Sequence, residues 1–496
     1  MKLGLIFPHQ LFKNHPVQDF AERVFLVADS LILGGDSEWP LIPHAKKLLL
    51  HKASMAVYAE KYELEITDDY SRLDLTDVTE IVVCRLVDDF LSRRLRGYCD
   101  KKSITFTELE TPAFVTPSEW GKQFFEGKKK PFMKTFYEAQ RKRMGVLVDD
   151  DNKPEGGRWS YDDENRKKFP LKAAPPADPE VIQTQREKKM IAKSSAELTE
   201  KKALVFGGYD DFIYPISHAS AQKWLDEFLQ KRFSSFGTYE DALTHRSKFL
   251  YHSVLTPMLN TGLLTPQQVV DRALEIGQEN EVELNNLEGF IRQIIGWREY
   301  MAIMYEKHGR YLRTQNYWKL EDGMPASIYN NKTGIPIVDD VLDKVKQDGY
   351  AHHIERLMVL GNFFLLLRVK PDDVFRWFSE MFVDAYDWVM VPNVYGMSQF
   401  SDGGLLVTKP YVSGSNYLRK MSDYKSGPWC EIWDALFWSF IDDYRDFFSS
   451  QYRMKMMVSH LVKMGGEKLA AHHQVAADFR KKMQQGGFLG DDLNLL

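Results

Sequence analysis

"DDDNKPEGGRWSYDDENRKKFPLKAAPPADPE", residues 149–180, separates two parts of the chain whose apolar residues recur with different spacings. The segment is rich in Asp, Pro, Gly and Lys, so it buries too little apolar surface to fold alone. We therefore predict an N-terminal domain over residues 1–135, a connector over residues 136–215 and a C-terminal domain over residues 216–496.

The N-terminal part alternates short β-rich runs with amphipathic segments. The apolar runs are KLGLIF (2–7), RVFLVAD (23–29), EIVVCRLV (80–87) and SITFTEL (103–109), and a helix-like segment covers residues 44–62. Such alternation predicts an α/β domain with a parallel, Rossmann-like sheet and crossover helices. No G-x-G-x-x-G motif follows the first run, so a standard dinucleotide site is not supported.

Beyond Ser217 the strand signals fade and apolar residues recur with helical periodicity. Ser217 is suited to cap the first of these helices, and Thr265 with Pro266 marks the start of the second. The helical segments are residues 220–233, 265–277, 286–308, 337–349, 350–369, 371–390 and 429–448. The C-terminal domain is therefore predicted to be all-α, and at this size it can bury a cofactor.

Composition narrows the class of protein. The 496 residues carry a formal charge of −5, so any binding to nucleic acid must come from a local basic face. The three cysteines, Cys84, Cys99 and Cys430, show no metal-ligand spacing, which indicates a reduced, intracellular protein. No signal peptide and no membrane-spanning apolar run is evident. We expect a cytoplasmic monomer.

The stretch YAHHIERL, residues 350–357, places His352 and His353 side by side on a predicted helix. Neighbouring helical residues point about 100° apart, so at most one of them can face a given pocket. Arg356 lies on the same side and could anchor an anionic group, with Asp384 among the aspartates that follow. From spacing alone, packing with an Arg–Asp ion pair is a better explanation than catalysis.

Two further stretches combine polar side chains with a helix start or a loop. Residues 250–267 contain Ser253, Thr256 and Asn260 just before a predicted helix start, where hydroxyls and free N–H groups can hold a phosphate. Many ordinary helix junctions look the same. Residues 392–404, PNVYGMSQFSDGG, read as a long glycine-rich loop that could line a site.

Basic and aromatic residues alternate over residues 127–145. Lys128, Lys129, Lys130 and Arg141 could follow the phosphates of DNA, and such contacts would make binding salt-dependent. A solvated helix face would look the same.

Taken together, six segments resemble one family. They are residues 156–166, 253–264, 288–301, 350–363, 391–404 and 408–424, and the last four are specific in combination. The chain resembles the photolyase/cryptochrome superfamily, and within it the deoxyribodipyrimidine photolyase-related group that includes the bacterial (6-4) photolyases.

The resemblance implies FAD held in the helical domain and ultraviolet-damaged DNA as the substrate, with the lesion flipped into the site. By matching positions, His353 corresponds to a histidine that takes part in proton transfer to a (6-4) photoproduct, with His352 and Tyr411 also at the active site. Trp377 matches a tryptophan that passes electrons to the flavin. The implied cofactor-binding residues are Ser253, Thr256, Asn260, Arg356, Asp384 and Asn393.

The sequence also departs from this group. Ile337, Lys425 and Pro428 stand where the group has three of the four cysteines that hold a [4Fe–4S] cluster, and only Cys430 remains. We expect no iron–sulfur cluster and no other metal, with Trp429 and Trp433 packed in its place. An antenna chromophore of the lumazine or deazaflavin type is implied for the N-terminal domain, although His9 replaces an aspartate there.

Four functions remain open from the sequence. A (6-4) photolyase leads, because returning a hydroxyl between two bases needs a proton donor and histidine suits that role near neutral pH. A cryptochrome-like blue-light photoreceptor, a cyclobutane-dimer photolyase and a flavin-free helical nucleic-acid-binding protein are the alternatives.

Overall fold

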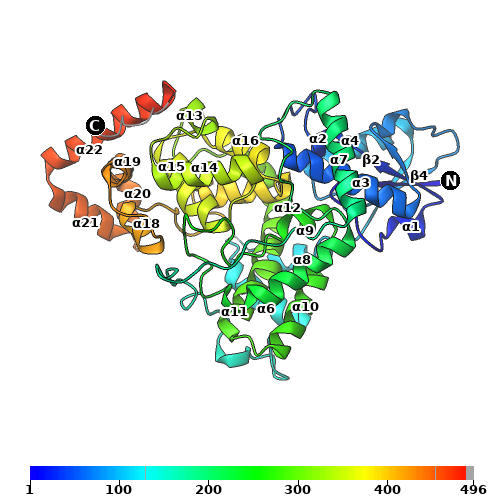
Figure 1. Cartoon of the computed structure of the whole chain (residues 1–496), viewed down its shortest axis with the longest axis horizontal. Coiled ribbons are helices and arrows are strands. Elements are labelled where there is room, and N and C mark those ends of the chain that lie inside the picture. The colour runs from blue at the N-terminus through cyan, green and yellow to red at the C-terminus, as the bar shows by residue number, and fades with distance from the viewer. Residues whose placement is uncertain (129, 453, 487–496) are drawn as a thin grey trace.

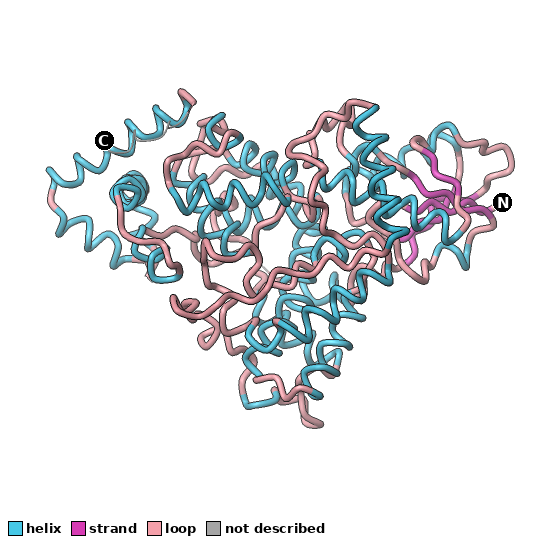
Figure 2. Tube along the Cα trace, in the orientation of Figure 1, coloured by secondary structure: helices cyan, strands magenta, loops and turns pink. Residues whose placement is uncertain are grey.

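The first 109 residues form a parallel sheet with helices on its faces, at one end of the molecule (Figures 1 and 2). The computed structural model describes all residues except 129, 453 and 487–496. The five strands have the order β3-β2-β1-β4-β5 and all pair in parallel. They are β1 (Lys2–Ile6), β2 (Arg23–Val27), β3 (Glu65–Thr67), β4 (Glu80–Cys84) and β5 (Thr105–Leu109).

The predicted α/β domain is therefore confirmed, and four of its five strands lie in the predicted runs. The short strand β3 was missed because two of its three residues, Glu65 and Thr67, are polar and leave no apolar run. The helices of this part are α1 (Val17–Phe20), α2 (Ser30–Leu33), α3 (Ala45–Tyr62) and α4 (Asp89–Lys102). Helix α3 begins at the N-cap residue His44, whose Nδ1 accepts a hydrogen bond from the Lys46 backbone N–H.

The predicted connector is more ordered than its composition suggests. Helices α5 (Ser118–Phe125) and α6 (Met133–Met144) precede the Pro- and Gly-rich segment, and α6 packs against the helical part of the chain. Helix α7 (Gln185–Glu200) follows it and packs along α3. Thr184 and Glu187 form a capping box at the start of α7, which stabilises a helix that has few buried residues of its own.

The remainder is helical, as predicted, and fills the centre and far end of the molecule (Figure 1). Its first helices are α8 (His218–Lys231), α9 (Thr256–Thr261), α10 (Pro266–Glu279), α11 (Leu284–Ile291), α12 (Glu299–Arg313), α13 (Ala326–Tyr329), α14 (Pro336–Asp348), α15 (Asn362–Leu366) and α16 (Pro371–Met381). They are followed by α17 (Asp387–Val391), α18 (Ser415–Met421), α19 (Pro428–Asp443), α20 (Arg445–Ser450), α21 (Lys455–Met464) and α22 (Gly466–Gln484). Among the described residues, every helix is too short or too polar to cross a membrane.

Three segments of this helical part are wound as π-helices. They are η4 (Arg292–Arg298), η5 (Glu355–Gly361) and η6 (Pro392–Ser398). The last of them corrects the sequence-based expectation of a loop, because residues 392–398 continue α17 as a wider helix. Wide turns of this kind are frequent at functional sites, and all three segments contribute residues to the same cavity.

Candidate flavin and DNA site

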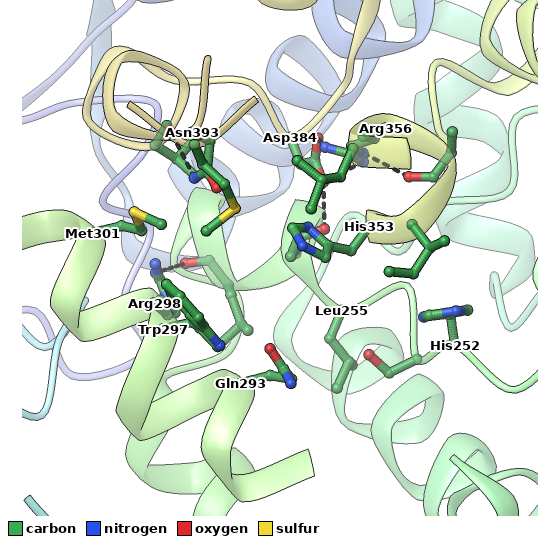
Figure 3. Close-up of a pocket in the computed structure, with 18 of the residues that line it drawn as sticks. His252, Leu255, Gln293, Trp297, Arg298, Met301, His353, Arg356, Asp384 and Asn393 are labelled. Atoms are coloured by element: carbon green, nitrogen blue, oxygen red, sulfur yellow. Dashed lines mark hydrogen bonds and ion pairs between the residues drawn. The ribbon is translucent and has the colours of Figure 1, made fainter. Parts of the chain in front are cut away.

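A cavity of about 280 Å³ lies at the centre of the helical part. Its wall is built from α9 with the loop before it, from η4, and from the segments 350–357 and 384–398 (Figure 3). Apolar and aromatic side chains such as Trp297, Leu357, Phe378 and Trp388 make up much of the lining. A largely apolar cavity with a few polar groups at fixed places is the usual form of a cofactor site.

Seven of the predicted site residues line this cavity, although they come from three distant stretches of the sequence. They are Ser253, Thr256, Asn260, His353, Arg356, Asp384 and Asn393. The three motifs that were ambiguous one at a time are thus brought together by the fold.

Asp384 is the centre of the polar wall. Its two carboxylate oxygens accept hydrogen bonds from Nη1 and Nη2 of Arg356, both at 2.9 Å. Thr256 Oγ1 donates to the same carboxylate, and Asn260 Nδ2 donates to the Asp384 backbone carbonyl at 2.8 Å. The side chain of Asp384 is 4% exposed, so its charge needs this set of donors.

The two neighbouring histidines have different surroundings, because the helix begins at His353 and His352 precedes it. The side chain of His353 projects into the cavity (Figure 3). Its ring is accessible from the cavity and is otherwise surrounded by the protein. This enclosure, with Arg356 close by, lowers the pKa of His353 to about 4. In the free protein His353 is therefore neutral at pH 7, and a negatively charged ligand beside it would raise its pKa.

His352 lies just before the helix and faces away from the cavity. Its ring stacks on that of His252, with centroids 4.2 Å apart and planes within 8°. Its Nε2 is 3.5 Å from Oε1 of Glu355, which accepts a hydrogen bond from Lys344 at 2.6 Å. Burial lowers the pKa of His352 and that of His252 well below the usual range. His352 therefore supports the wall behind His353.

Two predicted residues lie close to the cavity without lining it. Trp377 is fully buried behind Phe378 and contacts that ring edge-on at 5.3 Å. Tyr411 is largely buried near Asp241, an acidic residue of the cavity wall, and burial raises its pKa.

The predicted DNA-contacting residues divide between surface and interior. Lys128 and Lys130 are exposed, and Lys129 lies outside the described residues. The prediction that Arg141 contacts DNA was wrong. Its side chain is fully buried and donates to the backbone carbonyls of Val146 at 3.2 Å and Trp159 at 3.1 Å. Its guanidinium holds the chain after α6 and is inaccessible to DNA.

Sequence reasoning missed several residues of the cavity. Gln293, Trp297 and Arg298 come from η4, and His252 precedes the predicted Ser253. The stretch EGFIRQIIGWREYM belonged to the resemblance and to a predicted helix, but none of its side chains was singled out as a site residue. A π-helix changes the α-helical periodicity, so only the structure places Trp297 and Arg298 on the cavity wall.

Comparisons with known proteins identify the family. The family model of deoxyribodipyrimidine photo-lyase-related proteins matches residues 4–214. A (6-4) photolyase from Agrobacterium fabrum is 30% identical over 472 residues, which cover 89% of this chain and 91% of the relative. The chain belongs to the photolyase/cryptochrome superfamily.

Solved structures of this superfamily share the fold. A bacterial class III photolyase from Agrobacterium tumefaciens aligns with a TM-score of 0.55 at 16% identity, covering 99% of this chain and 92% of that one. A cryptochrome from Synechocystis aligns with a TM-score of 0.53 at 14% identity, covering 99% and 95%. Membership of the superfamily implies a photolyase/cryptochrome-type flavoprotein that binds FAD and has DNA as its substrate.

The hydrogen-bond donors that line the cavity fit the binding of FAD. Arg298 lines it with two buried nitrogens, Nε and Nη1, that have no hydrogen-bond partner among the residues that the structure describes. Its burial lowers the pKa of Arg298 to about 10, a sign that the charge lacks a full counter-ion. Buried donors of this kind normally have partners, and phosphate or hydroxyl oxygens would supply them. The apolar remainder of the wall fits a planar ring system.

Proposed function

We propose that this photolyase-family protein repairs ultraviolet-induced (6-4) pyrimidine photoproducts in DNA, driven by light. The observation that carries the proposal is the position of His353, an imidazole that is open to the cavity. Similarity over most of the chain to a relative named as a (6-4) photolyase supports it.

The chemistry requires a residue of this kind. Excited, reduced FAD supplies an electron when bound, but an electron alone does not return a hydroxyl from one base to the other. A proton must be given and recovered. We assign that proton to His353, because an imidazole next to a base that gains negative charge takes up a proton more readily than in the free protein.

The other predicted residues complete the site. We assign His352 and Tyr411 to its support, Trp377 to electron transfer, and Ser253, Thr256, Asn260, Arg356, Asp384 and Asn393 to cofactor binding. The Arg356–Asp384 pair and its donors fix the polar end of the cavity. Lys128, Lys129 and Lys130 are assigned to DNA phosphates.

Further features belong to the same proposal. We propose a cytoplasmic monomer with a sheet domain over residues 1–135 that could hold an antenna of lumazine or deazaflavin type, joined by residues 136–215 to the FAD-binding domain over 216–496. We also propose that it lacks an iron–sulfur cluster. Ile337 is 1% exposed, and Trp429, Cys430 and Trp433 are all buried on α19.

The test is a repair assay. Purified protein is loaded with reduced FAD, mixed with an oligonucleotide that carries one (6-4) or one cyclobutane lesion, and illuminated with blue light. Recovery of intact thymines from the (6-4) lesion is the expected result. Repair of the cyclobutane lesion alone would identify the other photolyase class. No repair of either lesion by a flavin-loaded sample would remove the enzyme proposal and favour a photoreceptor.

A further inference from the structure

Helix α3 belongs to the sheet domain, yet its polar side chains reach into the helical domain. His44 Nε2 bonds the Lys346 carbonyl at 3.0 Å, and Lys46 Nζ bonds Asp348 at 3.2 Å. His51 Nε2 and the Tyr386 hydroxyl are 2.9 Å apart. A helix surface that buries this many polar groups against another domain fixes the position of that domain.

Lys47 is the member of this set closest to the cavity. Its side chain is buried, and Nζ donates to the backbone carbonyl of Ala385 at 2.6 Å. Nζ also lies 5.4 Å from the centre of the Tyr386 ring. Ala385 and Tyr386 directly follow Asp384, the carboxylate that receives Arg356 on the cavity side. Lys47 therefore bonds the segment 384–386 on the side facing the sheet domain, whereas Arg356 bonds it on the cavity side.

The charges at this end of the cavity do not cancel. Arg356 and Lys47 are cations, and Asp384 is the anion between them, which leaves an excess of one positive charge among these three buried groups. Burial lowers the pKa of Lys47 to about 8, while Asp384 opposes that shift. Lys47 is therefore mostly charged at pH 7.

We propose that Lys47 is a positioning residue of the flavin site: it fixes the backbone that carries Asp384, and its positive charge favours an anionic ligand in the cavity. The proposal rests on the binding of FAD. Two electrons and one proton convert oxidised flavin to its reduced form, which is an anion at neutral pH. An unpaired positive charge nearby stabilises the anion relative to the neutral oxidised form.

The other titratable groups around Lys47, apart from Asp88, are neutral or paired near pH 7. The pKa values of His51 and His9 are lowered to about 3 and about 4, and the pKa of Tyr386 is raised. Asp387 is paired with Arg313. Asp88 lines the small cavity that Lys47 also faces, and its burial near Asp387 raises its pKa to about 7. Asp88 is thus the group whose titration must be separated from that of Lys47.

The matched experiment compares Lys47→Met with Lys52→Met. Lys52 is on the same helix but pairs at the surface with Glu197 at 2.8 Å. The midpoint potential of the bound flavin is measured in the dark against a redox dye. By Coulomb's law, a charge at an illustrative separation of about 10 Å and an effective dielectric of about 20 changes an equilibrium between an anionic and a neutral form roughly tenfold. We expect Lys47→Met to favour the oxidised form by about that factor, and Lys52→Met to match wild type.

A second measurement needs no flavin. Amide hydrogen exchange of residues 384–387 in the apoprotein is expected to be faster in Lys47→Met than in wild type or Lys52→Met. Lys47→Gln keeps a donor for the Ala385 carbonyl without the charge, so it should retain slow exchange while showing the shifted potential. This variant separates the hydrogen bond from the charge.

The outcomes are distinct from those of the repair assay. Equal potentials and equal exchange in Lys47→Met, Lys47→Gln and Lys52→Met would overturn the role of Lys47, whatever the repair activity. If neither Lys47 variant folds, the comparison is made on wild type and Asp88→Asn between pH 7 and pH 9. Uptake of one proton by the flavin alone makes the ratio of reduced to oxidised flavin fall about tenfold per pH unit. Loss of the Lys47 proton should make the fall steeper than this in both proteins, and a fall of only about tenfold per unit would overturn the proposal.

Discussion

Arg356 and Asp384 meet in a two-point ion pair, Nη1 to Oδ1 and Nη2 to Oδ2 at 2.9 Å each, on the wall of the central cavity. Their segments are 28 residues apart in sequence. The pair joins π-helix η5, which carries Arg356, to the turn before α17, and Thr256 from α9 donates to the same carboxylate.

This relationship gives the first prediction. Asp384→Asn leaves Arg356 without its counter-ion at a position where its side chain is only 16% exposed. Breaking one partner of a buried ion pair destabilises a protein by about 3–5 kcal/mol. We expect a loss of that order in urea unfolding and at least a tenfold weaker flavin affinity. The control is Arg310→Gln, which breaks an exposed pair with Asp89 and should cost less than about 1 kcal/mol.

His353→Ala tests the proposed proton donor. General acid–base residues contribute about 10²- to 10⁴-fold to rates, so (6-4) repair should fall by at least about 100-fold while the flavin spectrum stays unchanged. The quantity measured is lesion repaired per absorbed photon. His308→Ala, on α12 and outside the cavity lining, is the control. Full repair by His353→Ala would exclude this histidine as the donor.

Acid should destabilise the protein through buried histidines, and His44 is the clearest case. Burial lowers the pKa of His44 from 6.5 to about 4. The unfolded chain binds the proton first, so this stabilisation is complete above pH 6.5 and is lost as pH falls from 6.5 to 4. The contribution is about 3 kcal/mol. Asparagine caps helices without titrating, so His44→Asn should show a flatter dependence of unfolding free energy on pH. A slope equal to that of wild type would contradict this assignment.

The surface lysines predict the salt dependence of DNA binding. Each phosphate contact adds about 0.9 to the slope of log affinity against log salt. Lys128→Gln with Lys130→Gln should lower that slope by about 2, as measured by fluorescence anisotropy. Lys201→Gln, in the turn after α7, is the control. An unchanged slope in the double variant would place the DNA on another face.

Iron analysis tests the proposed absence of a cluster. A [4Fe–4S] cluster needs four thiolates, and Cys430 is the only cysteine in the C-terminal half of the chain. Purified protein should contain no stoichiometric iron, and Cys430→Ser should leave the visible spectrum unchanged. Four iron atoms per chain would refute the proposal.

Much of the fold was predictable because apolar periodicity is a local signal. The runs that became β1, β2, β4 and β5 and most long helices are visible in the sequence, whereas β3, with two polar residues of three, is not. Helix α7 was missed although the capping box of Thr184 and Glu187 marks its start, because the Pro-rich segment before it dominated the composition.

The site was predictable in its residue types and less so in its geometry. Resemblance named Arg356 and Asp384, but their bidentate contact depends on a tertiary arrangement. Arg141 was predicted to contact DNA because it lies among other basic residues. The local sequence does not show that its side chain is buried and donates to a backbone carbonyl. The contact of Lys47 could not be predicted from the sequence, because its partner, the Ala385 carbonyl, lies more than 300 residues further along the chain.

The three π-helical segments have a consequence for how this cavity can change. A π turn holds one residue more than an α turn, so each of η4, η5 and η6 behaves like a helix with one inserted residue. Removing that residue would let the segment close as an α turn, so the flanking helices would keep their contacts while the side chains within the segment changed direction. Along η4, such a deletion would turn residues like Trp297 and Arg298 away from the cavity without altering a single side chain. Insertions and deletions, more than substitutions, therefore decide which residues this cavity presents to its ligand.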